Sequence, residues 1–182
     1  IKQNGGESVP FCLVLSGSNS AFPHGETSHR KVGKQDIVLM DVGAVYEGYH
    51  ADLTRTVFVG GTTKIQRKIY EIVSKAQEAA IKTVKPGIKA EKVDIAARKI
   101  IENAGYGRYF THRTGHGLGF DVHEEPYIAP GSKTVLKPNM SFTIEPGIYL
   151  AGQFGVRIED DVVVSRTQGK LLSRLSKEML VI

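Results

Sequence analysis

The chain has 182 residues, of which 41% are apolar and 24% charged, a composition that fits a single folded domain and excludes a disordered protein. Its net charge of +5 does not come from a basic cluster interleaved with aromatic residues, so nucleic-acid binding is not indicated, and no apolar run is long enough to cross a membrane. The single cysteine, Cys12, excludes a disulfide scaffold and a thiolate metal cage and fits a cytoplasmic protein.

The first third of the chain predicts β-structure. Residues 9–15 are apolar and predict a strand, in which we expect Cys12 to be a small buried side chain. Residues 16–33, rich in Ser, Gly and Pro, predict a loop. Residues 36–44 and 49–59 then predict the two strands of a β-hairpin.

The rest of the chain predicts two helices and a second hairpin. Apolar residues at helical spacing predict helices over 62–84 and about 90–104, the first with a threonine cap and a Lys-Pro-Gly stop. Residues 140–149 and 155–164 predict the second hairpin, and the tail 171–182 predicts a short strand or turn.

Acidic residues occupy matching positions in the two predicted hairpins. If the first turn is centred on residues 46–47, Asp41 directly faces Asp52, and the same pairing places Glu145 opposite Glu159 in the second. The two hairpins also share a faint internal repeat, an acid two residues before a glycine, which suggests a pseudo-two-fold arrangement.

A single acid at such a position is more simply interpreted as a solvated edge residue or the partner of a nearby arginine. Four facing acids on mostly apolar strands indicate bound cations instead, because buried carboxylates repel one another when unpaired. Four carboxylates suit two divalent ions, and oxygen ligands with an added imidazole favour Mn, Co, Fe or Zn over Ca or Mg. Two such ions holding a bridging water would support hydrolysis.

Three of the six histidines lie in the stretch HRTGHGLGFDVHEEP, residues 112–126. It is not a zinc-protease helix, because His123 lacks a second histidine in register and Pro126 would break the helix. Its glycines do not have the spacing of a dinucleotide-binding loop. We expect the glycines on either side of His116 to let the backbone approach a metal ion or substrate closely.

Four blocks carry a family resemblance that covers essentially the whole chain: D-V-G-A-V-Y-E-G-Y-H-A-D-L-T-R-T (41–56), G-H-G-L-G-F-D-V-H-E-E-P (115–126), F-T-I-E-P-G-I-Y (142–149) and V-R-I-E-D-D (156–161). Together they resemble the pita-bread metallopeptidases, and within these the Xaa-Pro branch, which contains prolidase and aminopeptidase P. The resemblance implies an α/β pita-bread fold with pseudo-two-fold halves and a curved, mostly antiparallel sheet covered by helices.

The resemblance also implies roles for individual residues. The implied metal ligands are Asp41, Asp52, His116, Glu145 and Glu159, with Asp52 and Glu159 bridging two ions. Glu145 would also act as general base, His24 and His123 would hold the substrate and stabilise the tetrahedral intermediate, and Arg157 would pair with a metal-binding carboxylate. The remaining histidines, His112 among them, and the hairpin tyrosines are interpreted as surface or packing residues.

The implied activity is hydrolysis of the Xaa-Pro bond at the amino terminus of a dipeptide or short peptide, by a homodimer containing two divalent ions, Mn or Co first and Zn or Fe next. Three alternatives stay open: a methionine aminopeptidase, a non-catalytic peptide-binding relative, and metal-free creatine-type hydrolysis on the same fold. We expect residues 1–182 to be a catalytic-domain fragment that lacks an N-terminal domain and the first helical pair of the family. Whether it is a dipeptidase or an aminopeptidase is not decided by these residues.

Overall fold

The computed structural model describes all residues, 1–182. Its elements are, in chain order, β1 (Cys12–Ser16), β2 (Ile37–Tyr46), β3 (Tyr49–Phe58), α1 (Lys64–Thr83), α2 (Glu91–Asn103), β4 (Gly115–Gly117), β5 (Glu124–Ile128), β6 (Ser141–Ile144), β7 (Gly147–Leu150), β8 (Phe154–Arg157), β9 (Asp160–Val164), β10 (Gly169–Leu171) and β11 (Leu180–Val181). Three short 3-10 turns occupy Lys2–Asn4, Gly17–Ala21 and Gly107–Tyr109.

The strands form two larger sheets and one separate pair. The first sheet has the order β1-β2-β3-β11, the second β10-β9-β6-β4-β5, and β7 pairs with β8. All pairings are antiparallel except that of β11 with β3. The predicted mixture of helices with a mostly antiparallel sheet is therefore confirmed, and the tail 171–182 contains a short strand, β11, as expected.

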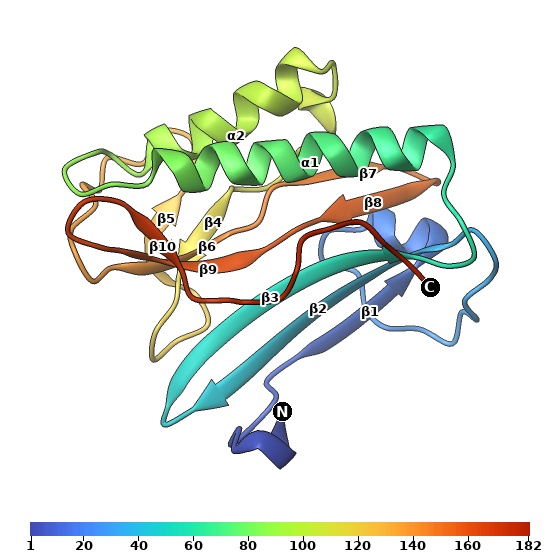
Figure 1. Ribbon diagram of the computed structural model, residues 1–182, viewed down its shortest axis with the longest axis horizontal. Coiled ribbons are helices and arrows are strands. Elements are labelled where there is room, and N and C mark those ends of the chain that lie inside the picture. Colours follow the sequence, from blue (N-terminus) through green and yellow to red (C-terminus); the bar gives the residue numbers. More distant parts are fainter.

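The helices α1 and α2 run side by side over the strands of the second half (Figure 1). Helix α1 begins where the sequence predicts, because Thr63 and Gln66 form a reciprocal capping box. Its buried residues Ile69 and Val73 join Ile144 and Val156 of the strands in one large apolar core. Neither helix is long and apolar enough to span a membrane.

The register of the first hairpin differs from the prediction. Its turn is centred on Glu47 and Gly48, both at positive φ (49° and 76°), so Asp41 pairs with Thr54 and Asp52 pairs with Gly43. The predicted direct pairing of Asp41 with Asp52 is wrong by two residues. Because a shift of two residues keeps a side chain on the same face, both carboxylates still point to one side of the sheet.

The second hairpin keeps its predicted register but is broken in the middle. Ile144 pairs with Asp160 before the break, and Gly147 pairs with Arg157 after it. Glu145 and Glu159 lie in the break, where their backbone N–H groups donate to Thr114 O and Thr54 O instead of to each other's strands. Both acids are thereby tied to strands or segments outside the hairpin.

Strand β1 is an edge strand, and one of its faces is open. Cys12 is exposed, and Val14 is 38% exposed. The prediction that Cys12 is buried is wrong, because its side chain points to the open face of the sheet while Leu15 points to the packed face.

Candidate metal centre

A pocket of about 540 Å³ lies between the two sheets, and all eight residues that the sequence predicts for the site line it. The lining residues are Phe11, Leu13, Pro23, His24, Asp41, Asp52, His112, Arg113, His116, Val122, His123, Glu145, Arg157 and Glu159. They come from β1, β2, β3, β4, the end of β8 and the loops between them, so the pocket exists only when both sheets are assembled.

Three of the predicted ligands are close enough to bind one ion. Donor atoms of Asp52, His116 and Glu159 all lie within 4.8 Å of one another. The Nε2 atom of His116 is 3.4 Å from Glu145 Oε1 and 3.8 Å from Asp52 Oδ2. Its Nδ1 lies 3.0 Å from Gly117 O, a carbonyl that can only accept, so Nδ1 carries the proton and the Nε2 lone pair faces the carboxylates. That arrangement is the one a metal-binding imidazole needs.

The pKa values of the carboxyl groups show the effect of crowding and burial. Burial, followed by the charge of Asp41, raises the pKa of Asp52 to about 9. Burial also raises the pKa of Glu145 to about 7, and burial with the charge of Glu145 raises that of Glu159 well above its ordinary value. His116 moves the other way, because burial lowers its pKa to about 4. The imidazole is therefore neutral at pH 7, and its lone pair is free for a cation.

A second, independent observation also indicates that these side chains suit divalent ions. The Oδ1 atoms of Asp41 and Asp52 are buried and have no hydrogen-bond partner. Buried carboxylate oxygens are nearly always satisfied in folded proteins, by a donor or by a metal ion. The two unpartnered oxygens, beside a free imidazole lone pair, are the groups that ions in this pocket would satisfy.

Arg157 forms an ion pair with Asp41, one of the predicted metal ligands. Its Nη2 donates to Asp41 Oδ2 at 2.5 Å, its Nε to Thr54 Oγ1 at 3.1 Å and its Nη1 to the Tyr149 hydroxyl at 2.9 Å. Thr54 in turn donates to Glu159 Oε2 at 2.5 Å. Arg157 and Thr54 therefore fix the orientation of two of the carboxylates.

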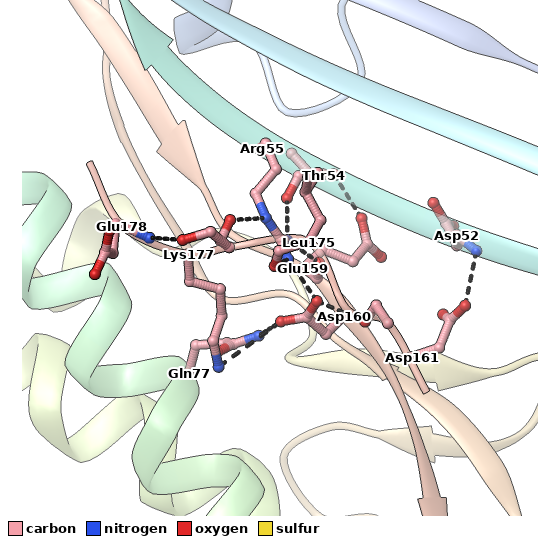
Figure 2. Close-up of polar contacts among 12 residues, drawn as sticks. Asp52, Thr54, Arg55, Gln77, Glu159, Asp160, Asp161, Leu175, Lys177 and Glu178 are labelled. Atoms are coloured by element: carbon pink, nitrogen blue, oxygen red, sulfur yellow. Dashed lines mark hydrogen bonds and ion pairs between the residues drawn. The ribbon is translucent and has the colours of Figure 1, made fainter. Parts of the chain in front are cut away.

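A second network lies behind the site on the opposite face of β3 (Figure 2). Asp160 accepts hydrogen bonds from Arg55 Nη2 and Gln77 Nε2, both at 2.7 Å, and from Ser173 Oγ at 2.6 Å. Asp161, the next residue on β9, accepts the backbone N–H of Asp52 on β3 at its Oδ2, at 3.1 Å. The two adjacent aspartates thus join β9 to helix α1 and to β3.

The sequence interpretation missed polar residues in the pocket wall. The ring of His112 donates from Nδ1 to Arg113 O at 2.7 Å, so its Nε2 accepts from the Tyr149 hydroxyl at 2.8 Å. Burial lowers the pKa of His112 to about 3, which keeps the ring neutral. Tyr149 is a packing residue as expected, but it packs against Leu15 and Leu39 of the first sheet, and its hydroxyl links His112 to Arg157. The proximity of His112 to the predicted ligand His116 was the available signal.

The role predicted for the glycines beside His116 is corrected. A Cβ atom on Gly115 would lie 1.9 Å from Thr143 O, and one on Gly117 would lie 2.4 Å from Glu125 O. These glycines make room for the backbones of the neighbouring strands β6 and β5, not for a metal ion or substrate. They still serve the site, since they bring β4 and His116 close to β6.

His24 and His123 are exposed and both line the pocket. The ring of His123 meets that of His116 edge to face, with centroids 4.2 Å apart. Both histidines therefore lie on the solvent-exposed side of the pocket.

Comparisons with known proteins identify related sequences and similar folds. The sequence matches metallopeptidase family M24 over residues 1–166. The chain is 45% identical to the Xaa-Pro dipeptidase of Pyrococcus furiosus, over 99% of this chain and 52% of that protein. The crystal structure of prolidase from Thermococcus sibiricus superposes with a TM-score of 0.97 at 55% identity, over 99% of this chain and 49% of the other. The crystal structure of X-Pro aminopeptidase from Thermotoga maritima superposes with a TM-score of 0.96 at 42% identity, over 100% of this chain and 52% of the other.

Proposed function

Since the chain belongs to metallopeptidase family M24, we propose that it is the catalytic part of a metallo-exopeptidase that hydrolyses the Xaa-Pro bond of dipeptides or short peptides. The fold is the pita-bread fold of its prolidase neighbours. The chain spans about half the length of the curated relatives it matches. The activity and substrate of the whole protein, and the description of this chain as a domain of a longer one, are therefore parts of the proposal.

One observation carries the proposal: four carboxylates and one neutral imidazole converge on a single pocket with two of the carboxylate oxygens unpartnered. Asp41, Asp52, His116, Glu145 and Glu159 would hold two divalent ions, Mn or Co first and Zn or Fe next. Bound there, such ions supply a water of lowered pKa and polarise the scissile carbonyl.

The other polar residues of the pocket have separate tasks in the proposal. Glu145, whose side chain is 15% exposed, would take a proton from the attacking water. His24 and His123 would hold the substrate and donate hydrogen bonds to the oxygen that becomes negative during attack. Arg157 would keep Asp41 in its binding orientation through the ion pair described above.

Arg113 supports a dipeptide substrate over a longer one. It lines the pocket, its guanidinium stacks on the Tyr127 ring at 4.5 Å, and it forms no ion pair. Arg157, the other pocket arginine, is already engaged by Asp41, Thr54 and Tyr149. A dipeptide ends in a carboxylate close to the scissile bond, and Arg113 is the cation available to bind it. The curated relatives named Xaa-Pro dipeptidase are consistent with this choice.

The test is a comparison of substrates with the full-length protein. We expect turnover of Ala-Pro in the presence of Mn or Co, abolished by a chelator and by Glu145→Gln, and slower turnover of a longer Xaa-Pro peptide. Cleavage of Met-Ala in preference to Ala-Pro would favour a methionine aminopeptidase. Binding of two metal ions without cleavage of any peptide would favour a non-catalytic relative.

The homodimer, the cytoplasmic location and the identity of the metal are further parts of the proposal. Size-exclusion chromatography coupled to light scattering tests the homodimer, since a dimer has twice the mass of one chain. Metal analysis of protein purified without added metal tests the last.

A further inference from the structure

An ion pair outside the pocket, Asp94 with Arg98 on α2, holds the segment that leads into it. The Arg98 guanidinium donates two hydrogen bonds to Asp94, at 3.0 and 2.9 Å. It also donates to the backbone carbonyl oxygens of Phe110 at 3.1 Å and His112 at 3.0 Å. Asp94 Oδ1 accepts a further hydrogen bond from the Thr114 hydroxyl at 2.7 Å. One ion pair therefore fixes three points in the five residues 110–114.

The environment of this pair is that of a buried structural element, not of a surface contact. The side chain of Asp94 is 1% exposed and that of Arg98 is 20% exposed. The guanidinium carbon also lies 4.2 Å from the centre of the Phe110 ring. By contrast, the pair of Glu78 and Lys82 on α1 has the same i,i+4 spacing but is 59% and 72% exposed and touches no pocket segment.

The segment that the pair fixes carries His112 to the pocket wall. The His112 ring is held between its own backbone, through Arg113 O, and the hydroxyl of Tyr149. A rotation of this segment would break the bond to Tyr149, because that bond needs the Nε2 lone pair to point at a hydroxyl 37 residues away in the chain. Tyr149 then contacts Arg157, which contacts Asp41.

We propose that Asp94 and Arg98 are positioning residues that act through His112: they hold the segment 110–114 so that His112 accepts the Tyr149 hydroxyl and keeps the Tyr149–Arg157–Asp41 chain in place. The expected effect of Asp94 and Arg98 on catalysis rests on the proposed function, whereas their expected effect on the position of His112 rests on the geometry alone. Neither residue touches the pocket, so the effect of their loss passes through the segment.

The experiment uses the full-length protein loaded with Mn or Co, and the variants Arg98→Met, Arg98→Lys, His112→Asn and the double variant Arg98→Met/His112→Asn. Lys82→Met is the matched control, since it removes an exposed ion pair of the same spacing. We expect Arg98→Met to lower kcat for Ala-Pro by about tenfold or more, with KM nearly unchanged. Arg98→Lys should recover part of the loss, because lysine keeps the charge beside Asp94 but cannot reach both carbonyls. Lys82→Met should match the wild type.

Two readouts separate a positioning role from general destabilisation. The double variant should be no slower than His112→Asn alone, because an effect that passes through His112 cannot add to its loss. In addition, nitrogen NMR of the imidazole should show the Nδ1-protonated form of His112 in the zinc-loaded wild type and a mixture of tautomers in Arg98→Met.

The proposal is overturned if the reductions in kcat caused by the two substitutions multiply in the double variant, or if Arg98→Met leaves kcat unchanged. It is also overturned if Arg98→Met only weakens metal binding, so that excess metal restores the full kcat. The NMR comparison still decides the inference if the wild type hydrolyses no peptide. In that case an unchanged His112 tautomer in Arg98→Met overturns the positioning role, whereas a changed tautomer supports it and only the proposed function fails.

Discussion

The buried carboxylates predict that the metal-free protein loses stability as the pH rises from 6.5 to 9. Burial and the charge of Asp41 raise the pKa of Asp52 from 3.8 to about 9. Between these values the folded state keeps a proton on Asp52 that the unfolded state has lost, so the free energy of unfolding falls as the pH rises. His112 and His116 have lowered pKa values, so their contribution to stability rises with pH and is complete only by about pH 7.5, one unit above the unfolded pKa. Between pH 6.5 and about 7.5 the histidines offset part of the loss, and above about pH 7.5 the acids decide the slope.

The magnitude follows from the width of the window. One pKa unit corresponds to about 1.4 kcal/mol, so Asp52 alone lowers the free energy of unfolding by about 3 kcal/mol between pH 6.5 and 9. Glu159, whose pKa is also raised, adds to the loss. Bound divalent ions stabilise the ionised carboxylates, so the loss should disappear in the metal-loaded protein.

The assay is urea unfolding at several pH values between 6.5 and 9, with a chelator and with excess Mn, for the wild type and Asp52→Asn. The metal-free wild type should become less stable with rising pH, and the variant should show a slope shallower by up to about 1.4 kcal/mol per pH unit. The reasoning is refuted if the metal-free wild type is equally stable across the window, or if Asp52→Asn leaves its slope unchanged.

Three other predictions concern single residues. Asp160→Ala leaves Arg55, with a side chain 8% exposed, without its carboxylate, and urea unfolding should show a loss of about 3–5 kcal/mol; a loss below about 1 kcal/mol would contradict a buried role for the pair. Arg113→Met should raise KM for Ala-Pro about tenfold or more without changing metal content, whereas an amidated Ala-Pro should not distinguish the variant from wild type. Gly115→Ala should prevent stable folding, seen as loss of a cooperative thermal transition, because the new Cβ would lie 1.9 Å from Thr143 O; a normal transition would show that β4 and β6 can separate.

The secondary structure could be predicted wherever the signal lies within a few neighbouring residues. Helix α1 begins at Thr63 because the cap and its partner Gln66 are three residues apart. The hairpin of β2 and β3 was predicted, but its register was not, because the turn moved to Glu47 and Gly48. Gly48 was the local signal for that turn, since glycine readily adopts positive φ.

The break in the second hairpin could not be predicted from its own residues. Pro146 has no N–H group to donate, which weakens the ladder there, but the break becomes stable because Glu145 and Glu159 donate their N–H groups to Thr114 and Thr54. Those acceptors lie 31 and 105 residues away along the chain, and only the packing of β3 and the segment before β4 brings them to the hairpin.

The sequence by itself indicated the carboxylates and the imidazole of the candidate metal centre, because acids two residues before a glycine and a histidine between glycines can be recognised from residue type and local spacing. The tertiary structure decided how those groups are held. Arg157 was predicted to pair with a carboxylate, but its bond to Asp41, the position of His112 against Tyr149 and the free guanidinium of Arg113 depend on contacts between distant segments. Such contacts arise when two sheets pack against each other, and a hydrogen bond made only after packing leaves no periodic pattern in either partner's sequence.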